Sequence, residues 1–145
     1  MISVLYVEDR LPILDIISRF LEKKGDVVVE SSRSAPEALQ KMDHISFDVI
    51  VTDYHSGEST GFDLLRQTRQ KGIMTPFVFF TSERDYFVDS ETRRYDLVAF
   101  VPKLRKSGSG FDELEKAIRT IISESKSASL NSEKDSKLLM HGEFP

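Results

Sequence analysis

The segment FDVIVTD, residues 47–53, is a short run of apolar, β-prone residues that stops at a hydroxyl and a carboxylate. Runs of this length and composition predict strands. Other short apolar, β-prone runs lie at residues 4–9 (VLYVED), 27–29 (VVV), 77–82 (FVFFTS) and 97–103 (LVAFVPK). Since residues 77–80 are entirely apolar, we expect that strand to be buried on both faces of a sheet.

Between these runs the apolar residues follow the period of a helix. After the first run they fall at residues 13, 14, 16, 17, 20 and 21, with Pro12 in the first turn and Gly25 at the end. Ser34 and Glu37 have the spacing of a capping box at the start of a second helix. Further helices are expected over 62–69, ended by Gly72, within 84–95, and over 111–122.

Strands that alternate with helices over the first 125 residues predict an α/β fold. We expect a doubly wound, five-stranded parallel sheet, built as (βα)5 and covered by helices on both faces in three α/β/α layers. Ligands of such sheets bind at the carboxyl ends of the strands, near the point at which the strand order reverses. The residues that directly follow each strand are therefore the candidates for function.

The composition fits one globular domain and narrows its chemistry. The 145 residues are 39% hydrophobic, enough for a core, and include no cysteine, which excludes disulfides and thiolate chemistry. A net charge of −4 gives no general attraction to nucleic acid or to anionic membranes. No apolar run approaches the ~20 residues of a membrane span, and the short apolar N-terminus lacks the features of a signal peptide. We expect a cytoplasmic protein.

The composition changes after Ile122. Residues 123–137 are almost all Ser, Glu, Lys, Asp and Asn, with Ala128 and Leu130 as the apolar exceptions. Such a segment is typical of a solvated linker. We therefore expect a domain over residues 1–125 and a flexible polar tail or linker over residues 126–145, too short to hold a DNA-binding module.

Charged and hydroxyl side chains follow several of the expected strands, namely Glu8 and Asp9 after the first, Asp53 after the third, Thr81 at the end of the fourth and Lys103 after the fifth. Each alone has an ordinary structural explanation, such as a helix cap for Asp9 or a turn for Asp53. Together, carboxylates at one rim repel one another unless a cation is present, and their hard oxygen atoms suit Mg²⁺. A carboxylate beside such an ion can accept a phosphoryl group as an aspartyl phosphate, with the lysine offsetting the charge.

In this order and at these strand ends, the residues resemble the receiver domain of two-component response regulators, over about residues 2–125. The matching positions are the acidic pair Glu8 and Asp9, the phosphoacceptor Asp53 with Gly61 eight residues later, Thr81, and Lys103 with the aromatic Phe100 three residues before it. The resemblance implies a flavodoxin-like fold and a switch that receives a phosphoryl group from a histidine kinase or a phosphotransfer protein.

For the metal, the resemblance implies that Asp9, Asp53 and the backbone carbonyl of His55 bind Mg²⁺, with Glu8 acting through a metal-bound water. The stretch after Asp53 departs from the family pattern, because Tyr54-His55-Ser56-Gly57 replaces the usual Met-Pro. The His55 side chain has two open interpretations: it either faces the phosphoryl group and tunes dephosphorylation, or it is solvated and idle.

For the switch, the resemblance implies that Lys103 pairs with the phosphoryl group, Thr81 moves toward it and Phe100 turns inward. The responding surface, which also offers a contact for a homodimer, would consist of the helix within 84–95, the strand 97–101 and the helix 111–122.

The residue after the lysine is a second departure, since Leu104 stands where the family has a proline in a cis peptide. A cis bond before leucine costs ~2.5–4 kcal/mol, so we expect a trans bond and a rearranged loop. Residues 104–110 contain KSGSG at 106–110 and predict a longer, flexible loop, in which Lys106 is a weaker substitute for Lys103.

Three functions fit these patterns to different degrees. The favoured one is an active receiver that signals to a downstream protein or to an output domain beyond residue 145, without binding nucleic acid itself. Whether it counts as an enzyme is a matter of definition, because it would catalyse its own phosphorylation and dephosphorylation. The second is a pseudo-receiver, an interaction module that is never phosphorylated. The third is a mononucleotide binder, which would need an anion-binding loop where Glu8 and Asp9 stand.

A basic group flanks the expected switch surface, and it is either a solvated face or a contact for an acidic partner: Arg93, Arg94, Arg105 and Lys106.

Overall fold

Five parallel strands form one sheet in the computed structural model, in the order β2-β1-β3-β6-β7. The structure describes residues 1–53, 55–56, 59–81, 94–105 and 108–142. The strands of the sheet are β1 (Ile2–Val7), β2 (Val27–Ser32), β3 (Val49–Thr52), β6 (Phe77–Thr81) and β7 (Val98–Pro102). The chain runs from β1 outward to β2 and then crosses back to β3, so the strand order reverses between β1 and β3. The predicted doubly wound parallel sheet is confirmed.

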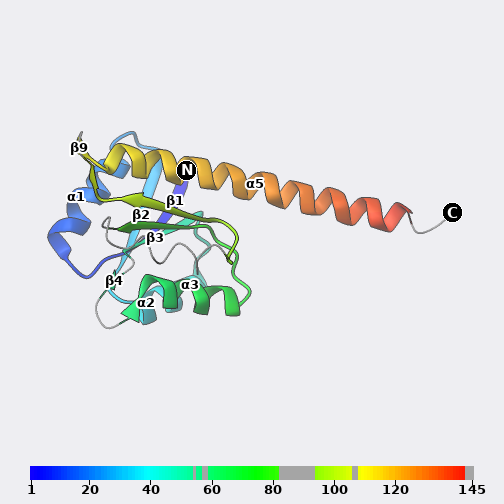
Figure 1. Cartoon of the computed structure of the whole chain (residues 1–145), viewed down its shortest axis with the longest axis horizontal. Coiled ribbons are helices and arrows are strands. Elements are labelled where there is room, and N and C mark those ends of the chain that lie inside the picture. Colours follow the sequence, from blue (N-terminus) through cyan, green and yellow to red (C-terminus); the bar gives the residue numbers. More distant parts are fainter. Residues whose placement is uncertain (54, 57–58, 82–93, 106–107, 143–145) are drawn as a thin grey trace.

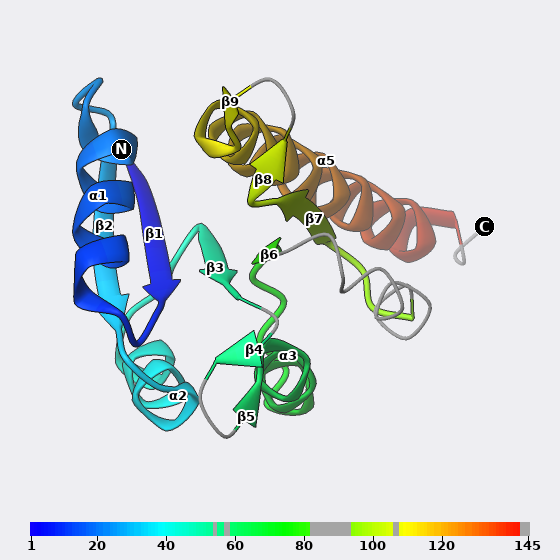
Figure 2. The ribbon, with the colours of Figure 1, turned by 60° about the vertical axis from the view of Figure 1, so that its left-hand side comes forward.

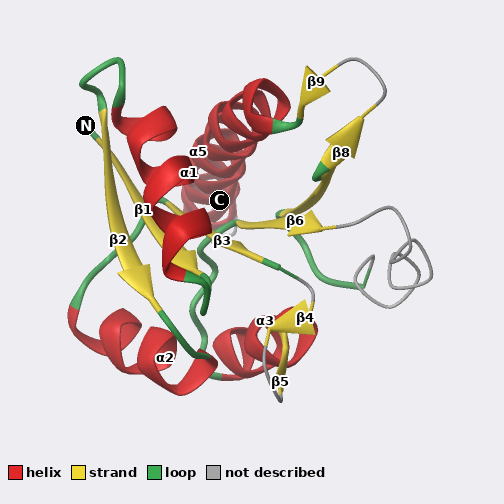
Figure 3. Cartoon of the chain, turned by 90° about the vertical axis from the view of Figure 1, so that its left-hand side faces the viewer, coloured by secondary structure: helices red, strands yellow, loops and turns green. Residues whose placement is uncertain are grey.

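Helices cover both faces of this sheet and produce the three predicted layers. The helices α1 (Leu11–Glu22) and α5 (Phe111–Gly142) lie on one face, and α2 (Ala35–His44) and α3 (Gly61–Gln70) lie on the other (Figure 3). Figure 2 shows α1 beside β1 and β2, and α5 beside β7.

The sheet separates two apolar cores, because successive side chains of a strand point to opposite faces. In β1, Val4 and Tyr6 pack toward α1 and α5, whereas Leu5 and Val7 pack toward α2 and α3. All five residues of β6 are buried, as the apolar run at 77–80 predicts. Covering both faces of the central strands leaves the ends of the strands as the places where polar side chains meet.

The predicted helix boundaries are borne out at α1, α2 and α3. The Ser34 hydroxyl caps α2 by accepting a hydrogen bond of 3.3 Å from the Glu37 backbone N–H. Gly25 and Gly72, which follow α1 and α3, have φ angles of +81° and +82°, a conformation that favours glycine. Leu97 also has a positive φ, of 60°, so β7 begins at Val98, one residue later than the sequence predicts.

Two short antiparallel hairpins correct the sequence analysis. β4 (His55–Ser56) pairs with β5 (Ser59–Thr60), a hairpin in addition to the five strands that the sequence predicts. β8 (Leu104–Arg105) pairs with β9 (Gly108–Ser109), where a flexible loop is predicted, because strand pairing satisfies the backbone of both short arms. The helix predicted within 84–95 falls largely on residues 82–93, which lie outside the described residues, as do Arg93 and Lys106.

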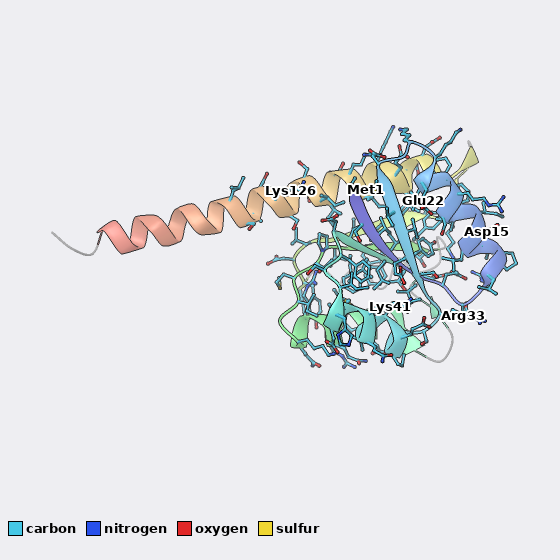
Figure 4. All side chains as sticks on the ribbon, turned by 180° about the vertical axis from the view of Figure 1, so that it is seen from behind. Met1, Asp15, Glu22, Arg33, Lys41 and Lys126 are labelled. Atoms are coloured by element: carbon cyan, nitrogen blue, oxygen red, sulfur yellow. The ribbon has the colours of Figure 1, made fainter. Side chains whose placement is uncertain are left out.

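The last helix is longer than predicted. The helical period of the apolar residues predicts an end near Ile122, yet α5 continues to Gly142 and extends beyond the rest of the fold (Figure 1). The reason is the absence of any helix breaker: residues 123–141 contain neither proline nor glycine. In Figure 4 the labelled Lys126 lies near the point where α5 leaves the other elements. None of the described helices has an apolar stretch of the length that crossing a membrane requires.

Candidate functional site

The carboxyl ends of β3 and β7 bring Asp53 and Lys103 together. The Lys103 Nζ lies 2.6 Å from Asp53 Oδ2, although the two residues are 50 positions apart in the sequence. Both side chains are largely buried, with 16% of Asp53 and 21% of Lys103 exposed. A charge-assisted hydrogen bond this short, shielded from solvent, is strong. The convergence of these two strand ends follows the sequence prediction.

The backbone holds Lys103 in position. Its N–H donates a 2.7 Å hydrogen bond to the carbonyl of Thr81, and its ammonium lies 5.9 Å from the centre of the Phe80 ring. All peptide bonds in the described residues are trans, so the predicted trans bond between Lys103 and Leu104 is confirmed. The lysine therefore reaches Asp53 without the cis proline of the family pattern.

Glu8, at the end of β1, faces the same space from the other side. Its backbone N–H donates to the carbonyl of Ser32 at 2.9 Å, and its side chain is only 2% exposed. The Glu8 Oε1 accepts two hydrogen bonds from Arg10, one from Nε at 2.8 Å and one from the backbone N–H at 3.2 Å. A buried carboxylate needs such partners, because burial without them is costly.

Arg10 is a residue of the site that the sequence analysis does not identify. Its Nη2 lies 4.0 Å from Asp53 Oδ2, so one guanidinium stands between the carboxylates of Glu8 and Asp53. The hydrogen bond to Glu8 raises the pKa of Arg10 above its ordinary value, and both carboxylates and Asp9 add to this effect. The only signal in the sequence is position, since a basic side chain directly after an acidic pair is well placed to neutralise it.

Asp9 is exposed and does not cap α1, because the N-cap position is occupied by Arg10. Within the described ranges, no three Asp, Glu or His side chains are arranged to hold a metal ion. The donor set nevertheless fits Mg²⁺, which takes one or two carboxylates and completes its shell with water or phosphate oxygens. Glu8 and Asp53 supply two such carboxylates around one cation, a place that Arg10 fills here.

Burial and the two acidic neighbours raise the pKa of the Tyr6 phenol, which is 1% exposed. Burial is the largest cause, the charges of Glu8 and Asp53 add to it, and Arg10 partly opposes it. The charges of Glu8, Asp53 and Arg10 therefore all act on the buried phenol at the end of β1.

The Thr81 side chain is buried at the end of β6. One strand away, Phe100 is partly buried and stacks on Phe79, with ring centres 5.1 Å apart and planes at 20°. The residues that the sequence analysis assigns to the switch thus lie on two adjacent strands, with Thr81 opposite Pro102 in the register.

Gly61 gives α3 its close approach to the site. A Cβ at this position would lie 2.4 Å from the backbone oxygen of Asp53 and 2.8 Å from a ring carbon of Phe79. Only glycine fits there, which explains the glycine eight residues after Asp53. His55 lies in the backbone of β4, and its side chain falls outside what the structure describes, so its tuning role stays a prediction.

Comparisons with known proteins identify a family and relatives that match most of this chain. The family model described as "Response regulator receiver domain" matches residues 4–119. Among curated proteins, the transcriptional regulatory protein CiaR of Streptococcus pneumoniae is 30% identical over 99 residues, which cover 68% of this chain and 42% of CiaR. The chain thus spans less than half the length of this relative.

Solved structures agree on the fold. The receiver domain of the Francisella response regulator 1452 is 23% identical, with a TM-score of 0.71 over 86% of this chain and 99% of that one. The response regulator TrrA of Thermotoga maritima, solved in complex with Mg²⁺-BeF, is 21% identical, with a TM-score of 0.70 over 83% of this chain and 99% of that one. TrrA has also been solved in complex with the histidine kinase ThkA.

Proposed function

This chain belongs to the response regulator receiver domain family of two-component systems, and we propose that it is an active receiver in which Asp53 accepts a phosphoryl group. The observation that carries the proposal is the pairing of the Asp53 carboxylate with the Lys103 ammonium at 2.6 Å, at the carboxyl ends of two parallel strands. A carboxylate held beside a cation at the ends of two strands, with part of each side chain still exposed, is suited to accept and stabilise an incoming phosphoryl group.

In the proposed reaction an Asp53 carboxylate oxygen attacks phosphorus. A P–O bond to Asp53 forms while the P–N bond of a phosphohistidine donor breaks; the bonding pair returns to that ring nitrogen, and the donor, which carries a proton on its other ring nitrogen, leaves as the neutral imidazole. The Lys103 ammonium then pairs with phosphoryl oxygens instead of the Asp53 carboxylate alone. The Thr81 hydroxyl, at the end of the neighbouring strand, donates a hydrogen bond to the phosphoryl group.

The metal of this proposal is Mg²⁺, held by Asp9, Asp53 and the backbone carbonyl of His55, with Glu8 acting through water. When bound, Mg²⁺ neutralises charge on the phosphoryl oxygens. Support comes from the oxygen donors at the strand ends and from TrrA, which was solved with Mg²⁺-BeF.

The proposed donor is a histidine kinase or a phosphotransfer protein, in line with the complex of TrrA with ThkA. The proposed output is a downstream protein or an output domain beyond residue 145, since CiaR is a transcriptional regulatory protein more than twice the length of the matched segment.

The surface that changes on phosphorylation would include β7 and the start of α5, with Phe100 following Thr81. A homodimer through the same surface is part of the proposal. The cytoplasmic location stays a prediction.

Intact mass tests this proposal. With acetyl phosphate and Mg²⁺, the wild-type chain should gain the mass of one phosphoryl group, and hydroxylamine should remove it because an acyl phosphate is labile to that nucleophile. Asp53→Asn should gain nothing. The control Asp43→Asn, which removes an exposed carboxylate on α2, should behave like the wild type. A wild-type chain that is never modified would instead support the pseudo-receiver.

A further inference from the structure

We propose that the Arg10 guanidinium is a built-in cation that competes with a divalent ion for the acidic pocket, and so sets how much Mg²⁺ this receiver needs. The inference rests on the proposed function, because it concerns the same pocket. It gives a regulatory role to Arg10, which is not one of the family's motif residues and to which the comparisons assign no role.

The geometry places Arg10 between Glu8 and Asp53, two of the carboxylates that the proposed function assigns to the metal site. Its Nε contacts Glu8 Oε1 at 2.8 Å, and its Nη2 reaches to 4.0 Å from Asp53 Oδ2. Glu8 is almost fully buried, so its charge has little solvent to stabilise it. The guanidinium and the Lys103 ammonium therefore act as the counter-charges of the pocket from opposite sides.

The charges explain why Arg10 and a divalent ion exclude each other. Among the residues that the structure describes around the pocket, the three carboxylates of Glu8, Asp9 and Asp53 are opposed by the two cations Arg10 and Lys103, a difference of one negative charge. A Mg²⁺ ion added while Arg10 stays would reverse that sign and place two cations side by side, which Coulomb repulsion disfavours. Binding of the ion thus requires the guanidinium to leave.

Arg10 is built so that it can leave without disturbing the fold. Its side chain is 56% exposed, and it makes no side-chain capping bond to α1 even though it is the N-cap residue. Only its backbone serves the helix, through its carbonyl, which accepts a 3.1 Å hydrogen bond from the Leu14 N–H. When the guanidinium moves into solvent, its hydrogen bond to Glu8 is broken. The free energy lost with this bond weakens the binding of the ion by the same amount.

The test is a Mg²⁺ titration of the full chain followed by amide chemical shifts, at fixed low salt and without any phosphoryl donor. Arg10→Gln should lower the dissociation constant of Mg²⁺ by about three- to tenfold, the effect of removing one competing ion pair. Arg10→Lys keeps the charge but lacks the planar guanidinium, so its dissociation constant for Mg²⁺ should lie between those of the wild type and Arg10→Gln. The control Arg19→Gln removes an exposed cation from the same helix and should leave the constant within about twofold of the wild type.

The outcomes separate this inference from the proposed function. Suppose that the wild-type chain binds Mg²⁺ and that Arg10→Gln binds it equally well or more weakly. This result would overturn the role of Arg10 and leave the receiver function standing. If neither chain shows any Mg²⁺-dependent shift, both ideas fail. Arg10→Gln and Arg10→Lys are both exposed-site changes, and circular dichroism checks that each variant is folded.

Discussion

The backbone N–H of Lys103 donates a 2.7 Å hydrogen bond to the carbonyl of Thr81, and this bond ties the ends of β7 and β6 together. The side chain that pairs with Asp53 and the hydroxyl assigned to the switch therefore belong to one hydrogen-bonded unit. If Thr81 moves on phosphorylation, as the proposed function holds, this bond would pass the movement to the backbone that positions the Lys103 ammonium.

Replacing Lys103 by Met should slow phosphorylation of Asp53 by acetyl phosphate by about 100-fold, because it removes the cation that would offset charge on the phosphoryl oxygens. The rate is measured by the growth of the phosphorylated mass. Lys24→Met, which removes the exposed cation paired with Glu115, is the matched control and should keep the wild-type rate. An unchanged rate in Lys103→Met would show that the lysine plays no part in the transfer.

Gly61→Ala should destabilise the fold by about 1–3 kcal/mol, although alanine favours helices more than glycine. The reason is the 2.4 Å approach of a Cβ to the backbone oxygen of Asp53. Urea unfolding gives the free energy. In Gly72→Ala nothing lies within 4 Å of the new Cβ, but φ is +82°, so we expect a smaller loss of about 1 kcal/mol. Equal stability of Gly61→Ala and the wild type would mean that α3 can shift freely.

Arg69 forms hydrogen bonds to backbone carbonyls in the segments that precede β6 and β7. Its guanidinium donates to the carbonyls of Ile73, Thr75 and Asp96 at 2.9, 2.8 and 3.1 Å and lies 5.4 Å from the centre of the Phe77 ring. Burial lowers its pKa, as expected of a largely enclosed cation.

Arg69→Met should therefore cost about 2–4 kcal/mol of unfolding free energy, because three carbonyls lose their donor. Thermal and urea unfolding both measure this loss. Arg66→Met on the exposed side of the same helix breaks only a pair with Asp63 and should change stability by less than about 0.5 kcal/mol. A small effect at Arg69 would indicate that water replaces the guanidinium.

Acid should weaken the contact between α5 and the turn after α1. Arg119 holds Asp26 with two hydrogen bonds of 2.9 and 3.0 Å, and these bonds lower the pKa of Asp26 below its ordinary value of 3.8. Because the folded state has the lower pKa, the pair stabilises the fold above the ordinary pKa, and the contribution is lost as pH falls through the folded value.

Asp26→Asn should accordingly flatten the fall of the unfolding temperature between about pH 5 and pH 2, as measured by thermal melts across that range. Asp43→Asn, on an unrelated exposed carboxylate, controls for the change in net charge. An identical pH profile for Asp26→Asn and the wild type would remove Asp26 from the acid response.

The sequence predicts the sheet, its order of alternation and the meeting of Asp53 with Lys103, because apolar runs and helical periods are local signals and strand ends in a parallel sheet converge by topology. It does not predict the place of Arg10, since the direction of a long exposed side chain depends on charges brought in from other strands. The length of α5 is missed for another reason: the polar composition after Ile122 is typical of a linker, but residues 123–141 contain no proline or glycine that would end the helix.

The continuity of α5 gives the molecule a lever arm. Its first turns pack against β6 and β7, and from Lys126, near the point where α5 leaves the other elements, to Gly142 the helix runs about 24 Å at ~1.5 Å per residue. By simple trigonometry, a tilt of about 10° where α5 leaves the sheet would carry the far end through about 4 Å. A small change in how the first turns of α5 pack on the sheet would thus appear as a displacement of several ångströms at Gly142.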